Sequence, residues 1–284
     1  MSKRIGIVLH HYRSEVVDLA ERALDWCSAN DVAAVLPKPD AELLDQSELG
    51  LMDESFGQGL DMLLSLGGDG TMLRAVQFAA PFDVAILGVN AGHLGYLTEV
   101  DPGQLETALE AWDAGKMGEE QRMLLEVEFV GEPTRAREIA LNEVVLERAE
   151  SGHTVSVDAV IGGERFTRFL ADGLVVATPT GSTAYSLSAG GPIVEPDFEA
   201  LVLTPVAAHM VFDRSLVLKP STTVELTVAG YRNGVVTLDG RQVTELVPGE
   251  TLVCRASDRR VRLLTMGQRN FHGILKEKFS LGDR

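Results

Sequence analysis

The fold of this 284-residue chain is decided by residues 61–80, which read DMLLSLGGDGTMLRAVQFAA. The first six residues are mostly apolar, as in a buried strand, and residues 71–80 place apolar side chains at helical spacing. Between them the glycine turn, residues 67–71 with the sequence GGDGT, bends the chain sharply. A buried strand that passes through a glycine turn into a helix predicts a parallel sheet with crossover helices.

The same alternation continues on both sides of this stretch. Short apolar strands are predicted at residues 5–9, 32–36 and 84–89, a helix follows Ser14 as its N-cap, and another covers residues 104–112. Strands that are apolar throughout and alternate with helices are typical of a parallel sheet whose two faces are covered.

From about residue 122 the hydrophobic pattern changes to that of an all-β protein. Short runs that are β-branched or alternating are separated by Gly, Pro, Asn or Asp, and they lie at residues 124–130, 139–147, 155–161, 174–178, 216–218, 224–228, 235–238, 252–256 and 261–265. Many short strands at this spacing favour a β-sandwich or a related all-β domain.

The two patterns predict an α/β protein with two domains. An N-terminal Rossmann-like α/β domain, residues 1–120, is followed by an all-β, sandwich-like C-terminal domain, residues 121–266. The last segment, residues 267–284, has no clear strand signal and is a candidate to return to the first domain. A chain of this length with 45% apolar residues can bury a core in each of two moderate domains.

The charge of the chain disfavours some classes of partner. With 25 basic and 42 acidic residues the formal net charge is −17, and residues 1–120 hold 7 of the basic and 21 of the acidic side chains. Attraction to nucleic acid or to an anionic membrane depends on cations, so neither partner is expected. The acidic segment, residues 40–54, has six carboxylates and no basic residue, and we interpret it as a solvated loop or short helix.

The cysteines and histidines favour a reducing compartment and no metal site built by the chain itself. Neither cysteine has a second Cys or a metal-spaced His nearby, and the six histidines show no ligand spacing. No apolar run reaches the roughly eighteen residues of a membrane span, and the N-terminus meets His10, His11 and Arg13 before it reaches signal-peptide length. We expect a soluble, cytoplasmic protein.

The glycine turn is the sharpest chemical feature. Its glycines let a ligand approach the backbone, and the amides at the start of the following helix favour an anion such as phosphate. Asp69 would repel phosphate, but it can accept a hydrogen bond from an alcohol and take its proton as the alcohol attacks a phosphoryl donor. The alternative is an ordinary turn in which Asp69 caps the helix.

A second cluster, residues 171–192, ends in TPTGSTAYSLSAGGP and combines hydroxyls, glycines and one tyrosine. It has too few large apolar groups for ordinary core, and its polar groups with one aromatic face suit a nucleoside. A Ser/Thr-rich turn with helix capping is the alternative.

Two shorter motifs lie near predicted strands. Asn142 and Glu143 are adjacent in an apolar run, where a bound ribose would satisfy them, although an edge strand or a strand end explains the pair equally well. Residues 90–98 follow a buried strand and therefore lie where ligands gather at the carboxyl ends of parallel strands.

Together the glycine turn, residues 90–95 (NAGHLG), the Asn142-Glu143 pair and residues 172–192 resemble the NAD kinase family. The resemblance implies that ATP, with a divalent metal, expected to be Mg²⁺, phosphorylates the 2′-hydroxyl of the adenosine ribose of NAD to give NADP. Lipid kinases of the diacylglycerol and sphingosine type have a similar glycine turn, so a lipid kinase stays an alternative, as does a dinucleotide-binding sensor without catalysis.

The resemblance also implies roles for individual residues. Asp69 would be the general base, and the phosphate-facing turn would be shaped by Gly67, Gly68 and Thr71. The NAD-binding set would be Gly70, Arg74, Asn142, Glu143, His153, Asp172, Thr183, Ala184, Tyr185, Ser186, Leu187, Ser188 and Gln242.

The resemblance also implies which part of NAD each of these residues would contact. Asn142 and Glu143 would hold the adenosine portion, and Asp172 would meet the nicotinamide end. The adenine would be framed by Thr183, Tyr185 and Ser188, while Arg74 would offer a cation to phosphate.

The chain departs from the family pattern at two places. Leu170 stands where some relatives have a basic residue, and residues 205–209 (PVAAH) lack a second proline. Family members are commonly dimers or tetramers whose sites are completed by a neighbouring subunit, so a homo-oligomer is expected.

Overall fold

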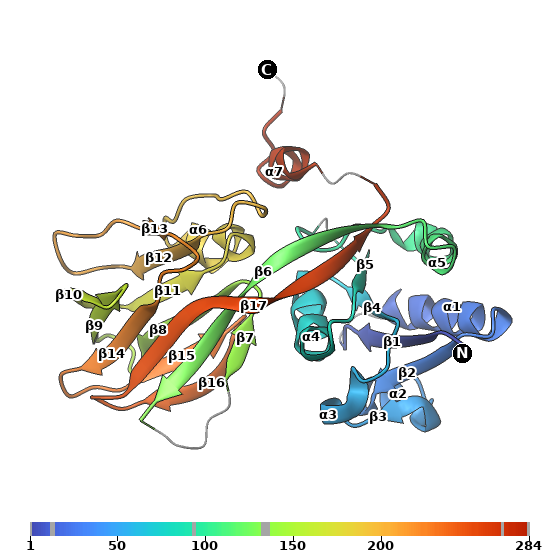
Figure 1. Ribbon diagram of the computed structural model, residues 1–284, viewed down its shortest axis with the longest axis horizontal. Coiled ribbons are helices and arrows are strands. Elements are labelled where there is room, and N and C mark those ends of the chain that lie inside the picture. Colours follow the sequence, from blue (N-terminus) through green and yellow to red (C-terminus); the bar gives the residue numbers. More distant parts are fainter. Residues whose placement is uncertain (1, 12–14, 93–94, 132–136, 268–269, 283–284) are drawn as a thin grey trace. The chain divides into compact units, whose positions relative to one another are not determined.

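The computed structural model (Figure 1) divides into two compact units. The α/β unit comprises Met1–Gln121 and Val261–Arg284, and the β unit comprises Arg122–Arg260. The structure describes residues 2–11, 15–92, 95–131, 137–267 and 270–282. Ser14, the predicted N-cap, and His93 and Leu94 of the NAGHLG motif lie outside the described residues.

The α/β unit contains a parallel sheet, as predicted. Its strand order is β5 (Ile86–Asn90), β4 (Met62–Gly67), β1 (Arg4–Leu9), β2 (Ala33–Pro37) and β3 (Gly50–Leu51), and each of these neighbouring pairs is parallel. Every residue of β4 is buried, which explains its continuous apolar run.

Helices supply buried side chains against both faces of this sheet. They are α1 (Glu15–Ala29), α2 (Lys38–Leu43), α3 (Asp53–Phe56), α4 (Asp69–Ala79) and α5 (Leu105–Asp113), with short 3₁₀ turns at Ser47–Leu49, Ala80–Phe82 and Pro102–Gln104. Helix α7 (Phe271–Lys278), by contrast, has no buried residue.

Successive residues of strand β1 contact helices on opposite faces of the sheet. Ile7 of β1 shares one core with Val16 of α1 and Leu105 of α5. On the other face, a Cβ on Gly6 would lie 2.8 Å from the Phe56 ring of α3, because alternate residues of a strand face opposite sides.

The β unit is an antiparallel sandwich. One sheet has the order β13 (Leu216–Leu218), β12 (Leu201–Val206), β11 (Gly173–Ala177), β8 (Glu143–Arg148), β15 (Gly234–Leu238) and β16 (Arg241–Leu246). The facing layer has the order β10 (Glu164–Ala171), β9 (Val155–Ile161), β14 (Val224–Ala229) and the start of β17 (Thr251–Thr265). Strand β6 (Gly118–Val130) also pairs with β17, and β7 (Glu138–Ala140) pairs with β6.

Apolar residues from both layers fill one core. Val157 of β9 and Leu226 of β14 belong to the same buried cluster as Leu146 of β8 and Val176 of β11. The predicted fold class, a parallel α/β part followed by an antiparallel sandwich, is therefore confirmed.

Some predicted elements were wrong in detail. The predicted strand at residues 139–147 is broken into β7 and β8, whereas the predicted strands at 252–256 and 261–265 are one continuous strand, β17. Strands β10, β12 and β16 were not predicted, and the last segment forms helix α7. None of the described helices is both long and apolar enough to cross a membrane.

Candidate active site

Asp69 is the first residue of α4 and lies directly after the carboxyl end of β4. The N-cap of this helix is Gly68 and no side chain caps it, so the alternative in which Asp69 is a helix cap is wrong. Its Oδ2 instead accepts the amide of Tyr96 at 2.9 Å, and its Oδ1 accepts the amide of Leu97 at 3.0 Å. A carboxylate oxygen has two acceptor sites, so each oxygen keeps one for a substrate.

Two glycines permit this close packing around Asp69. A Cβ on Gly95 would lie 2.3 Å from Asp69 Oδ1 and 2.5 Å from Thr98 Oγ1, and one on Gly67 would lie 2.1 Å from Thr71 Oγ1. By contrast, a Cβ on Gly68 or Gly70 would meet nothing within 4 Å. The turn is therefore tightly packed behind Asp69 and open at Gly68 and Gly70, where a ligand can approach the backbone.

Arg74, one turn further along α4, is already paired. Its Nη2 donates to Oδ1 of Asp40, and its Nη1 donates to the carbonyl oxygen of Leu9 at 3.1 Å. Asp40 is fully buried and also accepts the amide of Leu9 at 2.7 Å, with Nε2 of His11 2.7 Å away. The interpretation of residues 40–54 as solvated was therefore wrong for Asp40, since this carboxylate lies under Arg74.

Asn90 is a further polar side chain at this edge of the sheet. It ends β5 opposite Gly67, and the amide of Ala91 donates to the carbonyl of Gly67 at 3.0 Å. Asn90 is only 7% exposed, yet its Oδ1 has no hydrogen-bond partner among the described residues. Because buried polar atoms are normally paired, this oxygen is available to a ligand at the glycine turn.

The pair Asn142 and Glu143 lies in the β unit, where β7 gives way to β8. Their amides and that of Leu141 donate to the carboxylate of Asp239, at distances of 2.8–3.1 Å. Since β8 lies between β11 and β15, the edge-strand explanation for the pair was wrong, and the strand-end explanation fits the position of Glu143 at the start of β8.

Glu143 is a buried carboxyl group with an unpaired oxygen. Its residue is 6% exposed, and its Oε2 has no hydrogen-bond partner among the described residues. Burial, and secondarily the charge of Asp239, raise the pKa of Glu143 to about 8, against a backbone hydrogen bond from Tyr185 that lowers it. At neutral pH Glu143 is therefore mostly protonated and is able to donate a hydrogen bond to a ligand.

Asp172 follows β10 and pairs with a cation that the sequence did not reveal. Arg148 Nη1 donates to Asp172 Oδ1 at 2.8 Å and to the carbonyl oxygen of His153 at 3.1 Å. Arg148 thus brings together Asp172 and His153, two of the predicted binding residues. Leu170, the departure from the family pattern, is 42% exposed.

Tyr185 lies in the same region and is 39% exposed. Burial raises the pKa of its phenol, and the carboxylates of Glu147, Asp172 and Glu143 raise it further. The structure therefore brings Tyr185, Asp172 and Glu143 into one electrostatic neighbourhood of the β unit.

The hydroxyl-rich segment divides into an inner and an outer part. Ser186 is fully buried with its Oγ 3.0 Å from Thr204 Oγ1, and the buried Ser182 Oγ accepts the amide of Val194 at 2.9 Å. The expectation that this segment is unsuited to the interior was therefore wrong for these serines, because their hydroxyls are paired internally. The less buried positions of the predicted set are Thr183, Ala184, Tyr185, Leu187 and Ser188.

This segment packs directly on Asn142. A Cβ on Gly181 would lie 2.0 Å from the carbonyl oxygen of Asn142, and the amide of Thr178 donates to that oxygen at 2.8 Å. Gln242, by contrast, is an exposed residue of β16 that lies opposite Thr237. The predicted residues of the β unit, Gln242 apart, therefore concentrate around the ends of β8 and β11.

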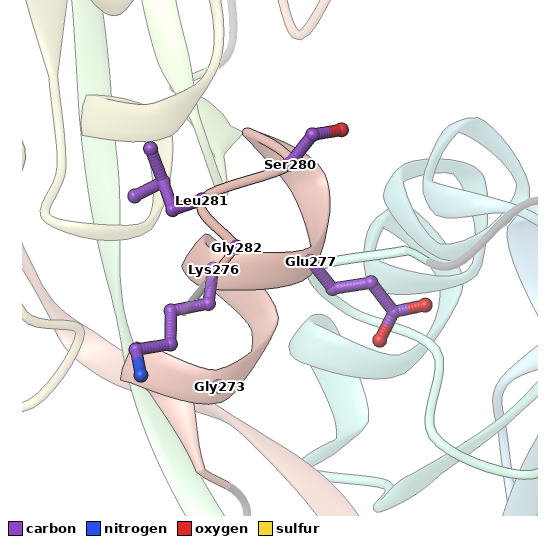
Figure 2. Close-up of a pocket in the computed structure, with 6 residues that line it drawn as sticks. All are labelled: Gly273, Lys276, Glu277, Ser280, Leu281 and Gly282. Atoms are coloured by element: carbon purple, nitrogen blue, oxygen red, sulfur yellow. The ribbon is translucent and has the colours of Figure 1, made fainter. Parts of the chain in front are cut away.

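The C-terminal helix α7 borders a pocket of about 430 Å³, lined by Gly273, Lys276, Glu277, Ser280, Leu281 and Gly282 (Figure 2). None of the predicted site residues lines this pocket. Helix α7 approaches the glycine turn differently, through Lys278, whose Nζ lies 5.0 Å from the centre of the Tyr96 ring.

Sequence reasoning missed several of these groups. Asp40, Arg148 and Asp239 were not assigned to the site, and Asn90 was included only as part of the motif at residues 90–95, without a role of its own. For Asp239 a signal was present, because Asp239-Gly240 directly after the predicted strand at residues 235–238 is typical of a hairpin turn. Asp40 had no usable signal, since its partners come from strand β1 and helix α4.

Comparisons with known proteins cover both halves of the chain. The family model for the ATP-NAD kinase N-terminal domain matches residues 5–117, and that for the ATP-NAD kinase C-terminal domain matches residues 141–266. The NAD kinase of Heliobacterium modesticaldum is 39% identical over 281 residues, covering 98% of this chain and 99% of the relative. NAD kinase 1 of Streptomyces coelicolor is 37% identical and covers 99% of this chain and 86% of the relative.

Solved structures show the same fold. An NAD kinase from Archaeoglobus fulgidus in complex with ATP has a TM-score of 0.76 at 25% identity, covering 98% of this chain and 100% of that one. Yeast NADH kinase complexed with NADH has a TM-score of 0.90 at 23% identity, covering 100% and 89%. Both domain models and nearly full-length relatives above 30% identity agree, and the chain therefore belongs to the ATP-NAD kinase family.

Proposed function

We propose that this protein transfers the γ-phosphoryl group of ATP to the 2′-hydroxyl of the adenosine ribose of NAD, which gives NADP and ADP. The observation that carries the proposal is the arrangement of Asp69 in a chain of this family. Its carboxylate is fixed by two amides, keeps an acceptor site on each oxygen, and lies beside the open glycines of the turn.

In the proposed reaction Asp69 accepts the proton of the 2′-hydroxyl. As that proton leaves, the ribose oxygen forms a bond to the γ-phosphorus, and the bond from this phosphorus to the β,γ-bridging oxygen breaks. The backbone amides of Gly68 and Gly70 would face the phosphates, where no side chain stands in the way. Fixed dipoles of this kind stabilise negative charge without reorganising during the reaction.

The residues of the β unit would bind the dinucleotide. We assign the adenosine ribose to Asn142 and Glu143, the adenine to the neighbourhood of Thr183, Tyr185 and Ser188, and the nicotinamide end to Asp172. The unpaired Oε2 of Glu143 supports the first assignment, because a ribose hydroxyl would satisfy it. His153, Gln242, Ala184 and Leu187 stay predicted contacts, while Ser186 would contribute through its backbone, since its hydroxyl is used inside the unit.

The phosphates require a divalent metal, which we expect to be Mg²⁺ carried by ATP. Such an ion is bound by oxygen ligands, usually one or two protein carboxylates together with the phosphates of the substrate. The Asp69 carboxylate fits this requirement, because each of its oxygens has a free acceptor site at the turn. When bound, the ion would neutralise charge that develops on the phosphates. Arg74 contributes less to this than predicted, because Asp40 already neutralises it.

We also infer a homo-oligomer in the cytoplasm. Among the exposed apolar side chains of the β unit, Phe166, Val211, Val217 and Tyr231 would be candidates for contacts between subunits. The buried free thiols of Cys27 and Cys254 are compatible with a reducing compartment.

The test of the function is incubation of the purified protein with NAD, ATP and Mg²⁺. NADP should form with the wild-type chain, and Asp69→Asn should lower kcat by about 10²-fold or more, because general-base catalysis contributes on that order. Asp25→Asn, an exposed position on α1, is the matched control and should keep the wild-type rate. An inactive wild type would refute the function, and a fully active Asp69→Asn would refute the base.

A further inference from the structure

Asp239 stands at the tip of the hairpin between β15 and β16 and belongs to none of the sequence motifs that indicated the function. Asp239 has φ 48° and Gly240 has φ 77°, the left-handed conformations that a two-residue type I′ turn requires. Asp-Gly suits such a turn, so the pair would be explained by the hairpin alone. Its carboxylate, however, does not face solvent.

The carboxylate of Asp239 holds three consecutive amides of another segment. Oδ2 accepts the amide of Leu141 at 2.8 Å, while Oδ1 accepts those of Asn142 at 2.8 Å and Glu143 at 3.1 Å. In return the amide of Asp239 donates to the carbonyl of Glu143 at 3.0 Å. These amides lie where β7 ends and β8 begins, so Asp239 takes the place of a strand partner at the break.

The carbonyl side of the same segment is fixed independently. Thr178 Oγ1 donates to the carbonyl of Leu141 at 2.6 Å, and the amide of Thr178 donates to the carbonyl of Asn142 at 2.8 Å. The backbone of Asn142 is thus held from two sides, by Asp239 on its amide and by Thr178 on its carbonyl. Little freedom is left for the direction in which the Asn142 and Glu143 side chains leave the backbone.

The charge of Asp239 also acts on Glu143. The carboxyl group of Glu143 is buried with an unpaired Oε2, and Asp239 is the charged group that opposes its ionisation most. The other charged or titratable groups of this neighbourhood are Glu147, Arg148, Asp172 and Tyr185, with Arg241 beside Asp239. Burial raises the pKa of Asp239 as well, while the three amide hydrogen bonds and Arg241 lower it and so favour the carboxylate. An ionised Asp239 favours the protonated, hydrogen-bond-donating form of Glu143.

From these contacts we infer that Asp239 is a positioning residue for dinucleotide binding, which acts through the backbone of Asn142 and Glu143 without touching the substrate. The inference rests on the proposed function, since it assigns NAD to that pair. It predicts an effect confined to NAD, because Asp239 and its partners lie in the β unit while the glycine turn lies in the α/β unit.

The decisive variant is Asp239→Asn. Asn-Gly preserves the hairpin turn, but the amide group has one acceptor oxygen in place of two, so at least one of the three amides loses its partner. The KM for NAD should rise about 10-fold or more, while the KM for ATP changes less than about 2-fold, since an unpaired buried donor costs the equivalent of roughly a tenfold change or more. Asp31→Asn is the matched control, because Asp31 is exposed and also has a left-handed backbone, with φ 56°.

A double mutant shows whether Asp239 acts through Asn142. The combined Asp239→Asn and Asn142→Ala variant should raise the KM for NAD by clearly less than the product of the two single effects. Thr178→Val, which removes the hydroxyl on the carbonyl side, should reproduce the NAD-selective rise and serves if Asp239→Asn fails to fold.

An unchanged KM for NAD in a folded Asp239→Asn protein, equal rises in both KM values, or fully multiplicative effects would overturn the inference. None of these outcomes affects the proposed function, which fails only if the wild-type protein makes no NADP.

Discussion

At the scale of single residues, Glu143 shows how burial sets chemistry. Its pKa is raised to about 8 mainly because the carboxyl group is removed from water. In the unfolded chain the same group ionises near its ordinary value of 4.5, so between pH 4.5 and pH 8 the folded state binds the additional proton. Because the folded state binds more protons than the unfolded state in this window, the free energy of unfolding falls as the pH rises. For one group the fall is at most about 1.4 kcal/mol per pH unit.

This sign gives a stability prediction. The free energy of unfolding of Glu143→Gln should fall less between pH 5.5 and pH 8 than that of the wild type, because the variant has no proton to lose at this position. Urea titration at both pH values measures the difference. Glu110→Gln, an exposed position on α5, should keep the wild-type pH dependence. Identical slopes for wild type and Glu143→Gln would show that Glu143 ionises normally in the folded protein.

Residues of this kind could be predicted from the sequence only in part. Asp69 and Glu143 stand in motifs, so their types and spacing indicated the site. The groups that hold Asp69 are the amides of Tyr96 and Leu97, and a backbone amide carries no residue-specific signal. Asp40 was predicted to be solvated together with the other five carboxylates of residues 40–54. No residue near it in the sequence indicates its ion pair with Arg74.

At the scale of elements, two of the missed strands share a physical cause. Strands β10 and β16 carry several charged residues and lie at sheet edges, where one side of the strand has no strand partner. The buried strands β1, β4 and β5 were predictable because both of their faces are covered, which makes their sequences apolar throughout. The break between β7 and β8 was missed because Asp239, which stabilises it, is almost 100 residues away.

The loop after β5 and the turn after β4 form one packed arrangement, which Gly95→Ala tests. The added Cβ would lie 2.3 Å from Asp69 Oδ1, so the base or the loop must shift. A displacement near 1 Å costs on the order of 10²-fold in rate, and we expect kcat to fall by roughly 10- to 100-fold. Gly103→Ala is the control, since a Cβ there meets nothing within 4 Å. Steady-state kinetics of both variants measure this effect on kcat. An unaltered kcat in Gly95→Ala would show that the packing of Gly95 does not set the position of Asp69.

At the scale of the whole molecule, the formal charge of −17 has to be reconciled with substrates that are anions. Repulsion between exposed charges fades beyond about 8–10 Å at physiological salt, so the global charge does not forbid a local anion site. Neutralisation must then occur inside the site. Because Arg74 is engaged by Asp40, we expect the main sources at the glycine turn to be backbone amides and the metal that ATP carries, with Lys278, near the Tyr96 ring, as a further cation.

Activity should therefore depend steeply on a divalent metal. In excess EDTA the rate of NADP formation should fall by about 100-fold or more, because a metal ion supplies several kcal/mol of charge stabilisation in phosphoryl transfer, and added Mg²⁺ should restore it. NAD binding measured by calorimetry provides the internal control. It should be unchanged by EDTA, since the proposed dinucleotide contacts in the β unit use hydrogen bonds and no metal. A rate that persists in EDTA would mean that the chain neutralises the phosphates with its own cations, whereas loss of NAD binding in EDTA would place a metal in the dinucleotide site itself.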